Sequence, residues 1–79
     1  MRIISKSARH FFGTHKGHEI NIEREATGRF YIIVRCITTG LDAYDGWAPE
    51  SVTTIREAKQ EALYGACLAK RPAKETDNG

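Results

Sequence analysis

The fold of this 79-residue chain is decided by the stretch Arg29-Phe30-Tyr31-Ile32-Ile33-Val34-Arg35-Cys36-Ile37. Aromatic and β-branched residues dominate this stretch, which is typical of a β-strand. Successive side chains of a strand point to opposite faces, so one face carries Phe30, Ile32, Val34 and Cys36 and the other carries Tyr31, Ile33, Arg35 and Ile37. Both faces are largely apolar. We therefore expect both to be covered in the functional protein.

The segment before this strand predicts an antiparallel partner for it. Residues 18–23 alternate polar and apolar, which places Ile20 and Ile22 on one face. A turn at 25–28, with Gly28 at a position that needs positive φ, joins this segment to residues 29–38. A second turn at 15–17 lets residues 9–14 pair with the same segment, and the three strands form a meander.

The segment after the central strand is less regular. Asp45-Gly46, between two aromatic residues, predicts a tight turn and a short fourth strand. Pro49 should end any pairing there.

A helix is predicted to follow from residue 55. Thr54 and Glu57 have the spacing of a capping box, in which each side chain bonds the other residue's backbone amide. Pro72 stops the helix at or before Arg71. One apolar stripe of the helix, which would pack on the sheet, consists of Ile55, Ala58, Ala62, Leu63 and Ala66.

Together these elements predict an α+β domain, a three- to four-stranded antiparallel meander with one C-terminal helix packed on one face. Residues 1–71 should form this single small domain, and residues 72–79 a disordered polar tail. A domain of this size buries only about 60% of its unfolded surface. Oligomerisation is one way in which such small domains gain stability.

One helix can cover only one face of the sheet, so the other face needs a different cover. Residues 1–8, with Ile3 and Ile4, could fold over it, a second copy of the chain could cover it, or another protein could. We expect a protein-protein interaction module that is homodimeric. The expected partner-binding residues are Tyr31, Ile33, Arg35 and Ile37, with Tyr44 and Trp47 as further anchors. The alternative for Trp47 is that it closes the end of the core.

No motif in the chain predicts catalysis or a bound cofactor. His15 and His18 lack further ligands at a metal-binding spacing, so no metal is expected. Cys36 and Cys67 are expected to be small buried hydrophobic residues, with a disulfide between them as the alternative. The chain has no glycine-rich phosphate loop and is too short for an obvious cleft, and we expect a non-enzymatic protein.

Nucleic-acid binding is the alternative function. The net charge is +2, but the first 18 residues hold four Lys or Arg residues and all three histidines without any acidic residue. The sheet face and this basic arm could contact phosphates. The residues that would do so are Arg9, Lys16, Arg24, Arg29 and Arg35.

The sequence also predicts a cytoplasmic location. No apolar run approaches the roughly 20 residues that a bilayer-spanning helix needs, and the N-terminus lacks the apolar region of a signal peptide. Two cysteines are too few for the disulfide framework of a small secreted domain.

Two segments resemble part of a known family. Residues 28–34, followed by the Thr-Ile-Arg-Glu-Ala motif at 54–58, are similar to the N-terminal module of HicB-type antitoxins, where a small antiparallel sheet leads into such a helix. That resemblance implies a non-catalytic, partner-binding protein. The same order also resembles the arm-binding domains of tyrosine recombinases, which implies DNA contact through the sheet. Chains of this size and pattern are similar in style to small phage and plasmid accessory proteins, including inhibitors.

Overall fold

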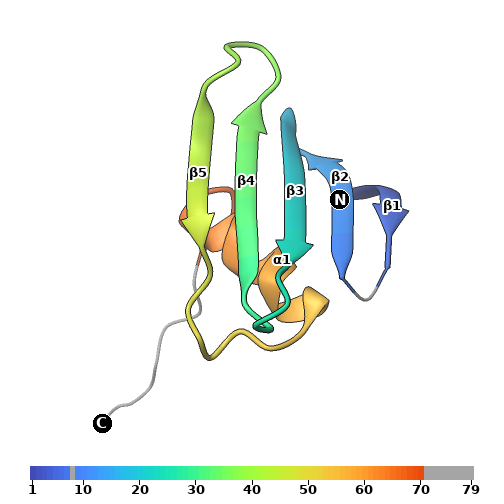
Figure 1. Cartoon of the computed structure of the whole chain (residues 1–79). Coiled ribbons are helices and arrows are strands. Elements are labelled where there is room, and N and C mark those ends of the chain that lie inside the picture. The colour runs from blue at the N-terminus through green and yellow to red at the C-terminus, as the bar shows by residue number, and fades with distance from the viewer. Residues whose placement is uncertain (8, 71–79) are drawn as a thin grey trace, which may run out of the picture.

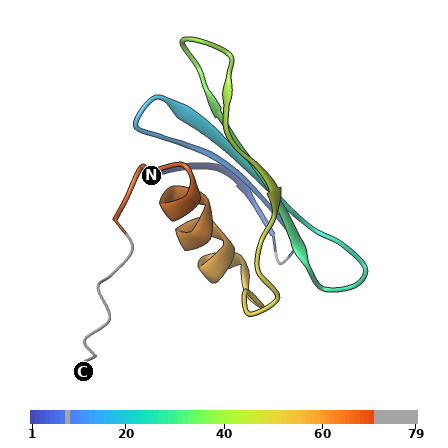
Figure 2. The ribbon, with the colours of Figure 1, turned by 90° about the vertical axis from the view of Figure 1, so that its left-hand side faces the viewer.

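The computed structural model describes residues 1–7 and 9–70 as a five-stranded antiparallel sheet and one helix. The strands are β1 (Arg2–Lys6), β2 (His10–His15), β3 (His18–Arg24), β4 (Phe30–Cys36) and β5 (Asp42–Trp47), and the helix is α1 (Ile55–Gly65). The strands lie in chain order across the sheet, as Figure 1 shows. Helix α1 lies on one face of the sheet, while the opposite face is open in Figure 2. The predicted α+β meander with one C-terminal helix on one face is confirmed.

The number of strands differs from the predicted three to four, because the N-terminal segment forms β1. This strand pairs with β2 through a register shift between Ile3 and Ser5, and all five of its residues are exposed. Such an irregular strand has no clean alternation of polar and apolar residues, so its sequence carries little signal. Because β1 extends the edge of the sheet, the alternative in which residues 1–8 fold over the second face is wrong.

The connection between β4 and β5 also differs from the prediction. Asp45 and Gly46 lie within β5, opposite Ile33 and Ile32, and do not form a turn. The chain reverses earlier, where Gly40 adopts a φ of 72° and its amide donates to the Cys36 carbonyl at 2.8 Å.

The core lies between α1 and the facing side of β2 to β5. It consists of Phe11, Ile20, Ile22, Phe30, Ile32, Val34, Ala48, Ala58, Ala62 and Ala66. Helix α1 packs chiefly against β3, β4 and β5. Its buried residues are alanines, whose small side chains allow the helix to lie close to the sheet.

The predicted helix start is confirmed. The Thr54 hydroxyl accepts from the Glu57 amide at 3.1 Å, and the Glu57 carboxylate accepts from the Thr54 amide at 3.1 Å. Further hydrogen bonds from Thr53 contribute most to lowering the pKa of Glu57. The helix ends at Gly65, earlier than Pro72 would require, and Cys67 follows with a φ of 60°.

At two positions of this fold, neighbouring atoms leave no room for a side chain. A Cβ at Gly13 would overlap the Arg2 carbonyl oxygen and would lie 2.8 Å from the Phe11 ring. A Cβ at Gly65 would overlap the ring of Tyr44, which packs against the helix at that point. Only glycine fits at either position without displacing a neighbour.

Candidate interaction surface

The sheet face that points away from α1 is called the open face below. Strand register arranges its side chains in three rows that run across the sheet. The row nearest the β3–β4 turn, at the bottom of Figure 1, is called the upper row and consists of Trp47, Tyr31, Glu23 and His10. The middle row consists of Asp45, Ile33, Asn21, Phe12 and Ser5. The row nearest the β4–β5 connection is called the lower row and consists of Asp42, Arg35, Glu19, Thr14 and Arg2. Apolar and charged groups are thus mixed on one exposed surface.

Trp47 is held between two side chains at one edge of the open face. Its ring meets Tyr31 edge-to-face, with centroids 5.0 Å apart and planes at 83°. The guanidinium of Arg29 lies 5.6 Å from the Trp47 ring centroid, and it also donates to the Ala48 carbonyl at 2.9 Å. Despite these contacts Trp47 is 48% exposed. It therefore presents a rigid, accessible aromatic surface and does not close the core.

Tyr31 has a second partner in Asp45. Its hydroxyl donates to the Asp45 carboxylate, and this bond, with a smaller contribution from desolvation, raises the pKa of Tyr31. The hydrogen bond favours the protonated phenol because only that form can donate. Tyr31 is thus fixed at both its ring and its hydroxyl.

We expect the replacement Asp45→Asn to lower the pKa of Tyr31. The replacement removes the negative charge beside Tyr31 and the carboxylate oxygen that accepts from its hydroxyl, so the phenolate forms at lower pH. Absorbance near 295 nm during an alkaline titration measures this change among the three tyrosines. Asp42→Asn, which removes a charge without removing this hydrogen bond, is the control and should shift the titration less. An unchanged titration in Asp45→Asn would show that the bond is absent in solution.

The centre and lower row of the open face carry a shallow hollow. It has a volume of about 120 Å³ and is lined by Phe12, Glu19, Asn21, Ile33 and Arg35. The Arg35 Nε lies 3.1 Å from an Asp42 carboxylate oxygen, and both side chains remain partly exposed. An exposed pair of this kind contributes about 0–1 kcal/mol to folding. The hollow is too small to enclose a ligand, so this face suits contact with another surface.

The structure separates the six residues that the sequence suggested for partner binding. Tyr31, Ile33, Arg35 and Trp47 lie together on the open face. Tyr44 lies on the opposite side of β5, packed against the core beside α1. Ile37 lies beyond the end of β4, where it is 55% exposed and its amide donates to the Gly17 carbonyl.

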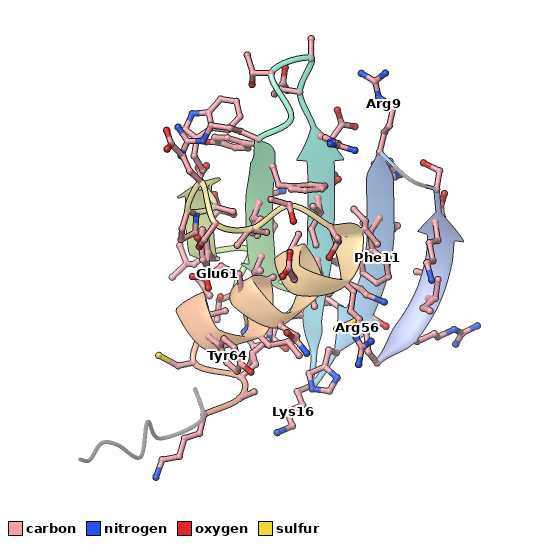
Figure 3. All side chains as sticks on the ribbon, turned by 90° about the horizontal axis from the view of Figure 1, so that it is seen from below. Arg9, Phe11, Lys16, Arg56, Glu61 and Tyr64 are labelled. Carbon is pink, nitrogen blue, oxygen red and sulfur yellow. The ribbon has the colours of Figure 1, made fainter. Side chains whose placement is uncertain are left out.

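The residues of the nucleic-acid alternative fall in three places. Arg9, Arg24 and Arg29 lie near the end of the sheet where β3 turns into β4. Lys16 lies at the other end of β2 from Arg9, as Figure 3 shows, and donates to the Leu68 carbonyl at 3.2 Å. Arg35 is paired with Asp42 on the open face. They form no continuous basic stripe of the kind that follows a nucleic-acid backbone.

The open face itself is acidic. It carries four carboxylates, on Glu19, Glu23, Asp42 and Asp45, against the three arginines Arg2, Arg29 and Arg35. Phosphates would be repelled by such a surface. The sheet face is therefore poorly suited to nucleic acid.

The cysteines differ in their surroundings. Both are free; Cys36 is half-buried, and hydrogen bonding to Thr39 lowers the pKa of its thiol. Cys67 is exposed, so its predicted burial is wrong: the helix ends before it, and its left-handed backbone turns it out of the apolar stripe. Within residues 1–7 and 9–70, no three His, Cys, Asp or Glu side chains converge as metal ligands.

Two residues of this surface were not predicted from the sequence. Phe12 lies on the open face because its neighbour Phe11 faces the core, and the alternation of a strand could have indicated this. Arg29 was assigned only to the nucleic-acid alternative, although it supports Trp47. Its contact joins positions 18 residues apart, which only the pairing of β4 with β5 brings together.

Comparison with known proteins gives one short match. Residues 24–38, which contain the β3–β4 turn and β4, match the model of the DVL family. No curated protein and no solved structure matches the chain. The described part of the chain has no helix with the length and apolar character needed to cross a membrane.

The expected resemblance to HicB-type antitoxins is wrong, since the family model that matches is that of the DVL family. Half of the resemblance came from the Thr-Ile-Arg-Glu-Ala motif at 54–58. The structure shows that Thr54 and Glu57 form a capping box. Helices of many unrelated proteins begin in this way, so the motif carries little family information.

Proposed function

We propose that this chain is a non-enzymatic protein-binding domain that recognises a second copy of itself through the open face. The observation that carries the proposal is Trp47, which is half-exposed yet fixed between Tyr31 and Arg29. Tryptophan, tyrosine and arginine are the residue types that most often dominate interface energies. Because these three are already ordered, little conformational entropy is lost when a partner binds.

The arrangement of the rows supports a second copy as the partner. A two-fold axis parallel to the strands places β5 over β1, β4 over β2, and β3 over β3 of the other copy. In the middle row Ile33 then faces Phe12, and Asp45 faces Ser5. Asn21 lies on the axis and faces itself, where two amides can bond each other.

The outer rows are arranged about the same axis. In the upper row Tyr31 faces His10, and Trp47 faces the chain just after β1, where the Ser7 amide bonds the His10 carbonyl. In the lower row Asp42 faces Arg2 and Arg35 faces Thr14. Glu19 and Glu23 lie on the axis with Asn21 and also face their own copies. Each has a basic or titratable neighbour in its row, Arg35 beside Glu19 and His10 beside Glu23. The strand directions of two stacked sheets differ by about 30°, so facing residues far from the axis are displaced from each other. The contacts nearest the axis therefore contribute most to binding.

The two-fold stacking also provides a cover for the sheet face that α1 leaves open. Each sheet would be covered by α1 on one side and by the other sheet on its open side, as in a sandwich of two sheets about 10 Å apart. Ile33 and Phe12, both half-buried in the single chain, would become fully buried. Burying two such side chains contributes a few kcal/mol at about 25 cal/mol per Å².

The mass of the protein in solution tests the proposal. We expect light scattering to give twice the chain mass of 8.9 kDa for the wild type and a single chain mass for Ile33→Glu, because a carboxylate buried at the interface is not neutralised there. Leu41→Glu, at a site that is 70% exposed outside the open face, is the matched control and should leave the dimer intact. A monomeric wild type, or a dimeric Ile33→Glu variant, would refute the proposal.

A cross-linking experiment tests the direction of the axis. In a Cys36→Ser/Cys67→Ser background, Asn21→Cys places one thiol on the axis, so a short bifunctional maleimide should join two copies efficiently. Ser5→Cys is the control, since residue 5 faces Asp45 of the second copy and lies far from its own counterpart. Equal cross-linking of both variants would contradict the two-fold arrangement.

A reducing, cytoplasmic setting is part of the proposal. Both cysteines are free, and Cys67 is exposed to solvent, where an oxidising compartment would pair or modify it. The nucleic-acid alternative remains distinguishable by experiment. It requires binding that weakens steeply with salt, whereas burial of Ile33 and Phe12 does not.

A further inference from the structure

A second feature lies at the end of the sheet, away from the centre of the open face. The β3–β4 turn and the β5–α1 connection come close together there, at the lower end of the sheet in Figure 1. Between them is a hollow of about 480 Å³. Its lining consists of Arg24, Thr27, Gly28, Arg29, Glu50, Val52 and Thr53.

The two arginines of this hollow are positioned by aromatic rings. The Arg24 guanidinium lies 5.7 Å from the Phe30 ring centroid, and that of Arg29 lies 5.6 Å from the Trp47 ring centroid. Neither forms an ion pair within residues 1–7 and 9–70. Cation–π contact fixes a guanidinium while leaving its charge and its N–H donors free for a ligand.

The hydrogen bonds of these arginines are largely unused. Of the five N–H donors of Arg29, one bonds the Ala48 carbonyl, and the Nε–H is enclosed without an acceptor in the described part of the chain. The remaining terminal N–H groups are those that a ligand could bond. Gly28, with a φ of 92°, lies beside Arg24, since a Cβ there would lie 3.7 Å from an Arg24 terminal nitrogen. Gly28 and both arginines line the same hollow.

Two smaller hollows adjoin this one, and their lining residues indicate which chemical groups a ligand would have. One, of about 270 Å³, lies beside Arg24 and is also lined by Arg9. The other, of about 380 Å³, shares Thr27 and Arg29 and is bounded by Trp47 and Ala26. Glu25 lines both smaller hollows and Glu50 lines the larger one, so three arginines stand against two carboxylates.

We infer that this end of the sheet binds a phosphomonoester that carries a planar ring. The phosphate lies between Arg24 and Arg29, whose forked donors match its oxygens, and the ring packs against Trp47. The excess positive charge favours an anion, while Glu50 keeps the affinity modest. Arg24 lies outside the rows that face the second copy, whereas Trp47 and its neighbour Arg29 are shared with the surface proposed for the dimer, so the site is tested in the single chain as well.

The test is a titration of the full chain with phenyl phosphate, followed by NMR at the Gly28 amide and the indole N–H of Trp47, the single tryptophan. We expect saturable shifts, with inorganic phosphate binding at least several-fold more weakly because it has no ring. Arg24→Gln should weaken phenyl phosphate binding by about tenfold or more. Arg24 is exposed, so this variant should fold normally.

Two controls make the result decisive. Arg56→Gln removes an exposed arginine on α1 that lines none of the three hollows, and it should leave binding unchanged. The titration is repeated in Ile33→Glu, where retained binding separates this site from the dimer. Absence of saturable shifts, or equal weakening by Arg24→Gln and Arg56→Gln, would overturn the inference.

Discussion

Replacing Phe11 by alanine will remove most of the stability of the protein, whereas replacing the adjacent Phe12 by alanine will remove little of it. Phe11 is fully buried under α1, and the Lys59 ammonium lies 5.1 Å from its ring centroid. Truncating a buried phenylalanine costs about 3–5 kcal/mol. That loss is comparable with the whole stability of a small domain, about 5 kcal/mol. The neighbouring Gly13 has no side chain that could fill the cavity.

Phe12 is the matched control, because it lies one residue further along the same strand on the open face. It is half-buried there, opposite Asn21, so its truncation should cost the single chain about 1 kcal/mol. Urea unfolding followed by circular dichroism measures both variants, in the Ile33→Glu background so that dimerisation does not add to stability. Equal urea midpoints for the two variants would contradict the assignment of Phe11 to the core face and Phe12 to the open face of β2.

Replacing Gly65 by alanine will destabilise the protein, which is the reverse of the usual effect in a helix. Alanine normally stabilises a helix interior by about 1 kcal/mol relative to glycine. Here the new Cβ would overlap the Tyr44 ring, which is held between β5 and α1. We expect a net loss of about 1–3 kcal/mol, the range for overpacking.

The sign of this effect should depend on Tyr44. In a Tyr44→Ala background the overlap is gone, so Gly65→Ala should become stabilising by the helix preference alone. Gln60→Ala, at an exposed position of the same helix, controls for composition and should change stability by only a few tenths of a kcal/mol. Thermal unfolding of the four variants gives the comparison. A stabilising Gly65→Ala in the wild type would show that Tyr44 moves away freely.

The parts of the fold that the sequence predicted are those governed by local rules. Residues 18–24 form a strand because they alternate, and the helix begins where Thr54 and Glu57 cap it. The unpredicted parts depend on pairing between distant segments. β1 exists because β2 offers an unpaired edge, and Asp45-Gly46 stays extended because β4 pairs with it.

The candidate surface was predicted in part for the same reason. The alternation of β4 identified Tyr31, Ile33 and Arg35 as residues of one face. Tyr44 and Trp47 are three positions apart, so on one strand they must lie on opposite faces, and only the assignment of a strand at 42–47 reveals this. The stacking of Arg29 on Trp47 required the register of β5, which the sequence does not give.

The contact between Gly13 and the Arg2 carbonyl has a consequence for variation in this chain. The backbone of β1 occupies the volume that a methyl group at position 13 would fill. Any other amino acid there would require the backbone of β1 to shift away from β2, which weakens the pairing of these two strands. The identity of the residue at position 13 therefore controls how well the first strand pairs with the rest of the sheet.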